Sequence, residues 1–133
     1  MILVDSSVWI DFFNGRDLAA VRRLADLLED GGAPLGMADL VLFEVLRGFR
    51  EEQDFNAARA TLSALPLVQI GGAAEALRAA QHYRALRSLG RTVRSPIDVL
   101  LASYCIENDF ALLHSDRDFD ALESLRGLKV WRH

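Results

Sequence analysis

Four acidic residues lie in or beside apolar segments, where a folded protein usually places uncharged side chains. Asp5 follows MILV, Glu44 lies inside LVLFEVL, Asp98 lies inside PIDVLLA and Asp116 follows ALLHS. A buried carboxylate without a partner is unfavourable unless it accepts hydrogen bonds, binds a cation or takes up a proton. Because the four residues come from separate segments, the pattern predicts one shared cation.

The remaining residue types narrow the kind of cation. The histidines, His82, His114 and His133, are scattered, and the single Cys105 lies in the apolar run VLLASYCI. A zinc site of nitrogen and sulfur ligands is therefore not expected. Ligands that are all oxygen favour Mg²⁺ or Mn²⁺, ions that serve phosphate chemistry. The sequence has no G-x-x-x-x-G-K-[ST] or G-x-G-x-x-G motif, which excludes nucleotide hydrolysis by a phosphate-binding loop.

Each acid also has an ordinary structural interpretation. Asp5 can cap a helix after a strand, and Asp116 in SDRDFD can lie in a solvated turn. Ser95 and Asp98 fit a capping box with proline at the first helical position. Glu44 is the hardest to explain in this way, because apolar residues surround it on both sides.

Alternating apolar segments place these acids in a fold. Strands are predicted over residues 2–4, 34–37, 66–70, 110–114 and 128–132, and helices over 8–14, 18–29, 38–49, 55–64, 73–89, 95–108 and 119–125. Gly31-Gly32 is predicted to end the second helix. Such alternation favours a mostly parallel α/β sheet covered on both faces, with ligands beyond the carboxyl ends of the strands. Asp5 and Asp116 follow two of those ends.

Length and composition indicate a single domain over residues 1–133. The chain has 51% hydrophobic residues and a formal net charge of −4, and its apolar content is sufficient for a core without disulfides. Cys105 is predicted to be a buried, unreactive thiol. The N-terminus lacks a basic leader and no run of about 18 apolar residues occurs, so a cytoplasmic protein without membrane association is expected.

One stretch of the chain is basic although the protein is acidic overall. No acid occurs between Glu75 and Asp98, whereas five arginines do: Arg78, Arg84, Arg87, Arg91 and Arg94. The last four are candidates for RNA binding through phosphates. A solvated helix face is the competing interpretation, and contacts with a protein partner are a third.

The ordered set of acidic segments resembles a known family. MILVDSSVWIDFF, LVLFEVLRGF, SPIDVLLASY and ALLHSDRDFD are similar to the four acidic motifs of PIN-domain proteins, most closely the VapC toxins of toxin–antitoxin systems. The resemblance covers essentially the whole chain. It implies a three-layer α/β/α PIN-like domain with a central five-stranded sheet, and a metal-dependent endoribonuclease that leaves 5′-phosphate and 3′-hydroxyl ends. It also implies a homodimer neutralised by a cognate VapB-type antitoxin protein in a hetero-oligomer.

The resemblance assigns roles to individual residues. Asp5, Glu44 and Asp98 match the three central acids, which would bind Mg²⁺ or Mn²⁺ and act in catalysis, and Asp116 matches the more variable fourth. Whether they hold one ion or two stays open.

Three neighbouring residues are expected to support these acids. Ser6 would orient Asp5 or a water on the metal, and Ser115 would support Asp116. Asp118 is an alternative to Asp116 as the fourth acid, because the spacing in SDRDFD fits either residue.

Two other functional classes are compatible with acids at strand ends. A receiver-like phosphoacceptor domain also binds Mg²⁺, but it needs a lysine near the phosphoryl group, and the only lysine, Lys129, begins the last predicted strand at the wrong end. A non-catalytic module whose acids cap helices and bind a partner's arginines is the second alternative.

Overall fold

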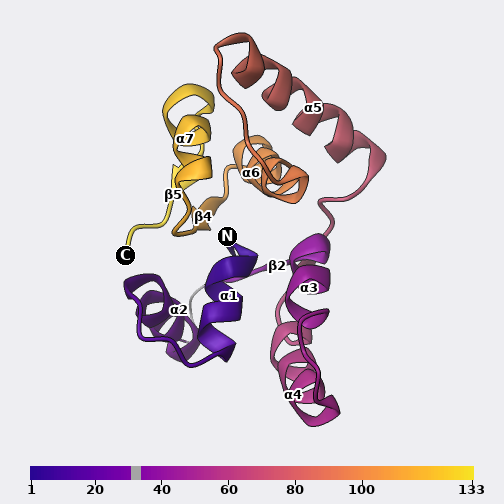
Figure 1. Cartoon of the computed structure of the whole chain (residues 1–133), viewed down its shortest axis with the longest axis vertical. Helices are drawn as coiled ribbons and strands as arrows, with labels where there is room; N and C mark the ends of the chain where they lie inside the picture. Colours follow the sequence, from indigo (N-terminus) through magenta and orange to yellow (C-terminus); the bar gives the residue numbers. More distant parts are fainter. Residues whose placement is uncertain (31–33) are drawn as a thin grey trace.

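Short strands alternate with helices along the whole chain (Figure 1). The computed structural model describes residues 1–30 and 34–133. The strands are β1 (Ile2–Val4), β2 (Met37–Ala38), β3 (Leu67–Val68), β4 (Ala111–Leu113) and β5 (Lys129–Val130). The helices are α1 (Ser6–Phe13), α2 (Ala19–Glu29), α3 (Asp39–Leu46), α4 (Glu52–Ser63), α5 (Ala73–Ser88), α6 (Pro96–Asn108) and α7 (Asp120–Arg126), with a short 3₁₀ helix, η1 (Arg117–Phe119). The predicted helix end at Gly31-Gly32 lies outside the described residues.

The strands pair in parallel, as predicted. β4 lies between β1 and β5, and β2 pairs with β3. β1 connects these two parts through a parallel bridge to Leu35, and the Ile2 N–H donates to the Pro34 carbonyl at 2.8 Å. The strand order is therefore β3-β2-β1-β4-β5. From β1 the chain first adds β2 and β3 on one side and then β4 and β5 on the other, so the order reverses at β1 while all strands stay parallel. Ligands of such sheets bind at this reversal, beyond the carboxyl ends of the strands.

Helices cover both faces of the central strands. All three residues of β1 are buried, although successive strand residues point to opposite faces. α1 packs on α2 and α3, whereas α5 packs on α6 and α7, so the helices form two groups with the strands between them (Figure 1). Together with the comparisons below, this arrangement confirms the predicted three-layer class. The largest fully buried side chains include Trp9 and Phe119.

Helix boundaries follow local chemistry, but several differ from the prediction: α1 begins at Ser6 rather than Val8, and α3 ends at Leu46 rather than Phe49. Pro96 opens α6 as predicted, but the Ser95 side chain makes no capping hydrogen bond, so the predicted capping box is wrong. The Asp98 side chain faces the other acids instead. α4 begins at Glu52 rather than Phe55, because Glu52 and Asp54 in its first turn favour the positive end of the helix dipole.

Two further predictions concern reactivity and membranes. Cys105 is fully buried, and burial raises the pKa of its thiol to about 12, as expected for an unreactive side chain. None of the helices in residues 1–30 and 34–133 has the length and apolar character needed to cross a membrane.

Candidate metal centre

The carboxyl ends of β1 and β4 bring the predicted acids to one edge of the sheet. Asp5 follows β1 directly, and its N–H donates to the Leu113 carbonyl at the end of β4, at 3.0 Å. Asp116 and Asp118 follow β4, while Asp98 lies in the first turn of α6. The parallel pairing of β1 with β4 thus joins acids from opposite ends of the sequence.

Two serines organise the N-terminal half of this cluster. The Ser7 hydroxyl donates to Asp5 Oδ2 at 2.5 Å, and the Ser6 hydroxyl donates to Glu44 Oε1 at 3.0 Å. Ser6 therefore contacts the acids, but it orients Glu44 on α3, whereas Ser7 holds Asp5. The first turn of α1 directs the two hydroxyls to different acids, so the Ser6 hydroxyl does not hold Asp5, and its alternative predicted role, orienting a water on the metal, stays a prediction.

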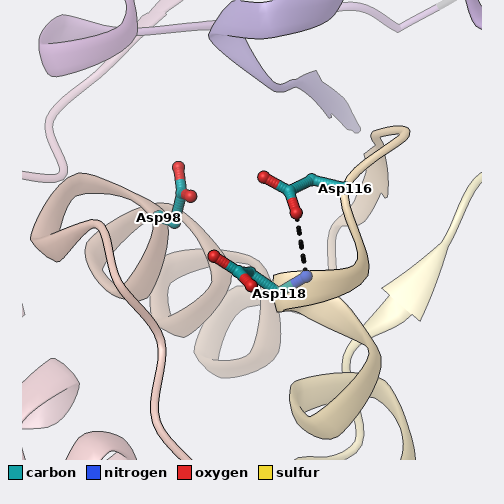
Figure 2. Close-up of side chains that lie close together, drawn as sticks. All are labelled: Asp98, Asp116 and Asp118. Carbon is teal, nitrogen blue, oxygen red and sulfur yellow. Dashed lines mark hydrogen bonds between the residues drawn. The ribbon is translucent and has the colours of Figure 1, made fainter.

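The C-terminal half contains three aspartates whose carboxylates converge (Figure 2). One carboxylate oxygen from each of Asp98, Asp116 and Asp118 lies within 4.8 Å of the other two. The Asp118 N–H also donates to Asp116 Oδ1 at 2.9 Å, which fixes the Asp116 side chain at the start of η1. Asp116 and Asp118 were predicted as alternatives for the fourth acid, but both carboxylates lie in the cluster.

Asp98 is repelled by the acids of both halves of the cluster. This side chain is 9% exposed, and burial is the main cause that raises its pKa to about 7. The charges of Asp5, Glu44, Asp116 and Asp118 raise it further, in that order. All five carboxylates are therefore close enough to interact, with Asp98 between the two halves.

The ionised form of Asp5 is also unfavourable in the absence of a cation. It is 4% exposed, and burial raises its pKa, with a further increase from Glu44. Hydrogen bonds from Ser7 oppose this shift. Without a cation the site carries more negative charge than its surroundings stabilise, and a divalent ion reverses this by favouring the ionised carboxylates.

The donor set fits a hard divalent ion. Mg²⁺ binds oxygen ligands at about 2.0–2.1 Å, so two ligands of one ion lie at most about 4.2 Å apart. The spread of up to 4.8 Å among Asp98, Asp116 and Asp118 is close to this limit. Small inward movements of these carboxylates would bring the three oxygens within reach of one ion.

One arginine of the basic stretch reaches the acids. Arg94 Nε donates to Asp118 Oδ2 at 3.2 Å from the loop before α6. Arg84 bonds to Gln81 within α5, and the guanidinium of Arg87 lies 5.7 Å from the Tyr83 ring centre. Within the described ranges, Arg94 is the one cationic side chain that forms an ion pair with any of the five acids.

His114, which the sequence did not single out, takes the supporting position expected of Ser115. His114 Nδ1 accepts from the Asp116 N–H at 3.2 Å, and its ring packs on Phe119 with centroids 4.6 Å apart. Ser115 is exposed and makes no side-chain hydrogen bond in the described part of the chain. His114 is still buried just beyond the end of β4, whereas the chain exposes Ser115 as it leaves the sheet.

The lysine and the other buried histidine lie away from the acids. Lys129 pairs with Asp109 at 2.5 Å, at the amino ends of β4 and β5. It therefore lies at the opposite end of the sheet from the acids, where it cannot serve as the lysine of a receiver domain. His82 is buried between Glu107 and Arg126, at 2.9 and 3.0 Å. Its contacts join α5, α6 and α7, so its role is structural.

The chain matches known proteins along nearly all of its length. The family model for the PIN domain matches residues 2–125. Over 130 residues the chain is 30% identical to the VapC ribonuclease Mb1587 of Mycobacterium bovis, covering 98% of this chain and 97% of that protein. The ribonuclease VapC11 of Mycobacterium tuberculosis matches with the same identity and coverage.

A solved structure shares the fold at lower identity. It is described as VapBC2 from Rickettsia felis bound to a DNA fragment from their promoter, and it superimposes with a TM-score of 0.75 at 16% identity, covering 99% of this chain and 100% of that one. The match to the PIN family model and the relatives that cover nearly the whole chain are consistent with the cluster of acids at the carboxyl ends of the strands. The chain belongs to the PIN-domain family.

Proposed function

We propose that this protein is an endoribonuclease that uses Mg²⁺ or Mn²⁺ to hydrolyse RNA phosphodiester bonds. The observation that carries the proposal is the convergence of the Asp98, Asp116 and Asp118 carboxylates within 4.8 Å of one another, with Asp5 and Glu44 close enough to act on Asp98. Relatives named as ribonucleases cover the chain from end to end. The whole chain, residues 1–133, acts as one domain in this proposal.

In the proposed site Asp98, Asp116 and Asp118 hold the ion, with Asp5 and Glu44 completing its surroundings. When bound, a divalent ion supplies charge stabilisation for a phosphodiester under attack and lowers the pKa of water. Asp5, fixed by Ser7, and Glu44, fixed by Ser6, are placed to accept a proton from the attacking water. Arg94 pairs with Asp118 at the edge of the proposed site.

The protein is proposed to work as a toxin under the control of a second protein. Solved structures with this fold include one described as a toxin–antitoxin complex from Klebsiella pneumoniae, with a TM-score of 0.68 at 19% identity over 90% of each chain. We propose a VapB-type antitoxin as the partner, a homodimer as the toxin unit and the cytoplasm as its location. These assignments rest on the family and on the names of its relatives.

Cleavage of a fluorescently labelled RNA tests the nuclease proposal. The purified protein should cleave it with Mg²⁺ or Mn²⁺, lose activity in EDTA, and regain it when the metal is restored. Asp98→Asn should lower the rate at least about a hundredfold, because it removes a ligand and a charge at the centre of the site. Asp54→Asn, an exposed acid on α4, is the matched control.

Two outcomes would count against the proposal. Full activity in EDTA would exclude a required metal, and full activity of Asp98→Asn would exclude the acidic cluster as the active centre. Adding the product of the adjacent antitoxin gene to the same assay should suppress cleavage. Failure of suppression would remove the toxin–antitoxin assignment and leave the nuclease chemistry in place.

A further inference from the structure

A hollow lies directly beside the acidic cluster and shares Asp116 with it. Its volume is about 280 Å³, and its lining includes His114, Arg117, Arg132 and His133, with Asp120 as a second acid. Asp116 belongs both to the cluster and to the wall of the hollow. An extended ligand bound at the acids therefore meets this hollow beside them. Its cations can bind an anion there.

His114 offers the hollow a buried donor that lacks a partner. The side chain is 7% exposed, and its Nδ1 accepts a hydrogen bond from the Asp116 N–H. The ring proton therefore lies on Nε2, and this atom is buried without a hydrogen-bond partner among the described residues. A buried N–H without an acceptor is unfavourable, so the position favours a ligand that brings an oxygen.

Arg117 adds a guanidinium that the protein does not use. It is exposed, and within residues 1–30 and 34–133 it forms no ion pair and no side-chain hydrogen bond. The nearby Arg132 pairs with Glu123, and the His133 ring bonds to the His114 carbonyl. Arg117 is thus the cation most available to a phosphate.

A second hollow continues the basic surface away from the acids. It measures about 430 Å³, shares Arg132 and His133 with the first, and adds Arg22 and Arg23 from α2. Arg23 Nε donates to the Arg132 carbonyl at 3.1 Å, which ties α2 to the C-terminal segment. The two hollows form one path lined by arginines, although Asp26 also lies on it.

The basic stretch around α5 offers a poorer route. The hollow between α5 and α6 is lined mainly by apolar side chains, including Ala79, Val93 and Val99. Arg84 contacts that hollow but bonds to Gln81, and Arg94 is paired with Asp118. Phosphates in that hollow would meet no arginine free of a partner among the described residues, although Arg91 of the same stretch, which does not line the hollow, is exposed and unpaired there.

We propose that the substrate RNA leaves the acidic cluster over the C-terminal segment, and that the hollow beside Asp116 binds the backbone phosphate next to the cleaved one. Arg117 contacts this phosphate, His114 borders its site, and Arg132 and Arg23 line the path beyond it. This inference rests on the proposed nuclease function, and it replaces the Arg84 to Arg94 stretch as the main RNA surface.

Binding of a short single-stranded RNA tests this path. Asp98→Asn is the parent protein, because it should bind RNA without cutting it, and fluorescence anisotropy gives Kd over a series of salt concentrations. Adding Arg117→Gln should raise Kd about 5- to 20-fold. It should also reduce the slope of log affinity against log salt by about 0.7, as expected for the loss of one phosphate contact to a single strand. Arg84→Gln, at an arginine that is also exposed, is the matched control and should change Kd less than about twofold.

The outcomes separate this inference from the proposed function. If wild-type protein cleaves RNA but Arg117→Gln leaves both Kd and salt slope unchanged, the path is wrong and the nuclease stands. A large effect of Arg84→Gln alone would place the RNA over α5 and overturn the path as well. If wild-type protein neither cleaves nor binds RNA, both proposals fall. Circular dichroism should show equal folding, since Arg117 has no partner to lose among the residues that the structure describes.

Discussion

Replacing Asp98 with asparagine should stabilise the metal-free protein at alkaline pH. Asp98 is buried, and its pKa is raised from 3.8 to about 7, chiefly by burial and then by the surrounding acids. The native state therefore holds this proton more tightly than the unfolded chain does. The resulting stabilisation is complete below about pH 4 and is lost as the pH rises through about 7.

The pKa shift sets the size of the effect. A shift from 3.8 to about 7 spans about 3 pH units, and each unit corresponds to about 1.4 kcal/mol, so ionised Asp98 destabilises the fold by up to about 4 kcal/mol. Asparagine keeps the shape of the protonated acid without its charge. The variant should approach wild type below about pH 4 and exceed its unfolding free energy by about 2–4 kcal/mol at about pH 8.

Urea denaturation in EDTA, followed by circular dichroism across this pH range, measures the difference. The exposed Asp17→Asn control should show a nearly constant difference from wild type, because its ion pair with Arg22 is solvated. Adding Mn²⁺ should stabilise wild type, by about 2.7 kcal/mol at a hundredfold excess over Kd, and leave Asp98→Asn nearly unchanged. A stability difference between Asp98→Asn and wild type that does not vary with pH would refute the electrostatic reasoning.

Two further predictions concern the surroundings of the site. Arg94→Gln should tighten Mn²⁺ binding in the absence of RNA by about two- to fivefold in calorimetry, because Arg94 competes with the ion for Asp118, while Arg91→Gln should not. Weaker Mn²⁺ binding by Arg94→Gln would mean that the arginine supports the metal site instead. His82→Ala should lower the unfolding free energy by about 2–4 kcal/mol, because it leaves Glu107 and Arg126 without their buried partner, yet leave Mn²⁺ affinity unchanged in the folded protein. A loss of Mn²⁺ affinity in that variant would contradict its structural role.

Local patterns predicted the parts of the fold that local chemistry controls. Pro96 marked the start of α6, and the apolar runs before Asp5 and Asp116 marked two strands that end at one edge of the sheet. Parallel strands necessarily share that edge, so the meeting of these acids was predictable. The PIN resemblance was confirmed by the family match, while the metal ligands remain a proposal.

Contacts between distant side chains were not predictable in the same way. Nothing in the sequence assigns Ser6 to Glu44 and Ser7 to Asp5, because that choice depends on how α1 faces α3. The approach of Arg94 to Asp118 and the unpaired Nε2 of His114 depend likewise on loops packed against other elements. Strand order decides these neighbours, and it cannot be obtained from hydrophobic patterns alone.

The pairing of β1 with β4 has a consequence for the synthesis of the protein. β1 is made first, but its partner comes near the other end of the chain, and Asp5 and Glu44 meet Asp98, Asp116 and Asp118 only after that pairing. Pairing of such distant segments is slow and follows the formation of local helices. The proposed nuclease therefore stays inert on the ribosome until its last quarter has been translated. A chain terminated before β4 has no complete site and cannot attack the RNA around it.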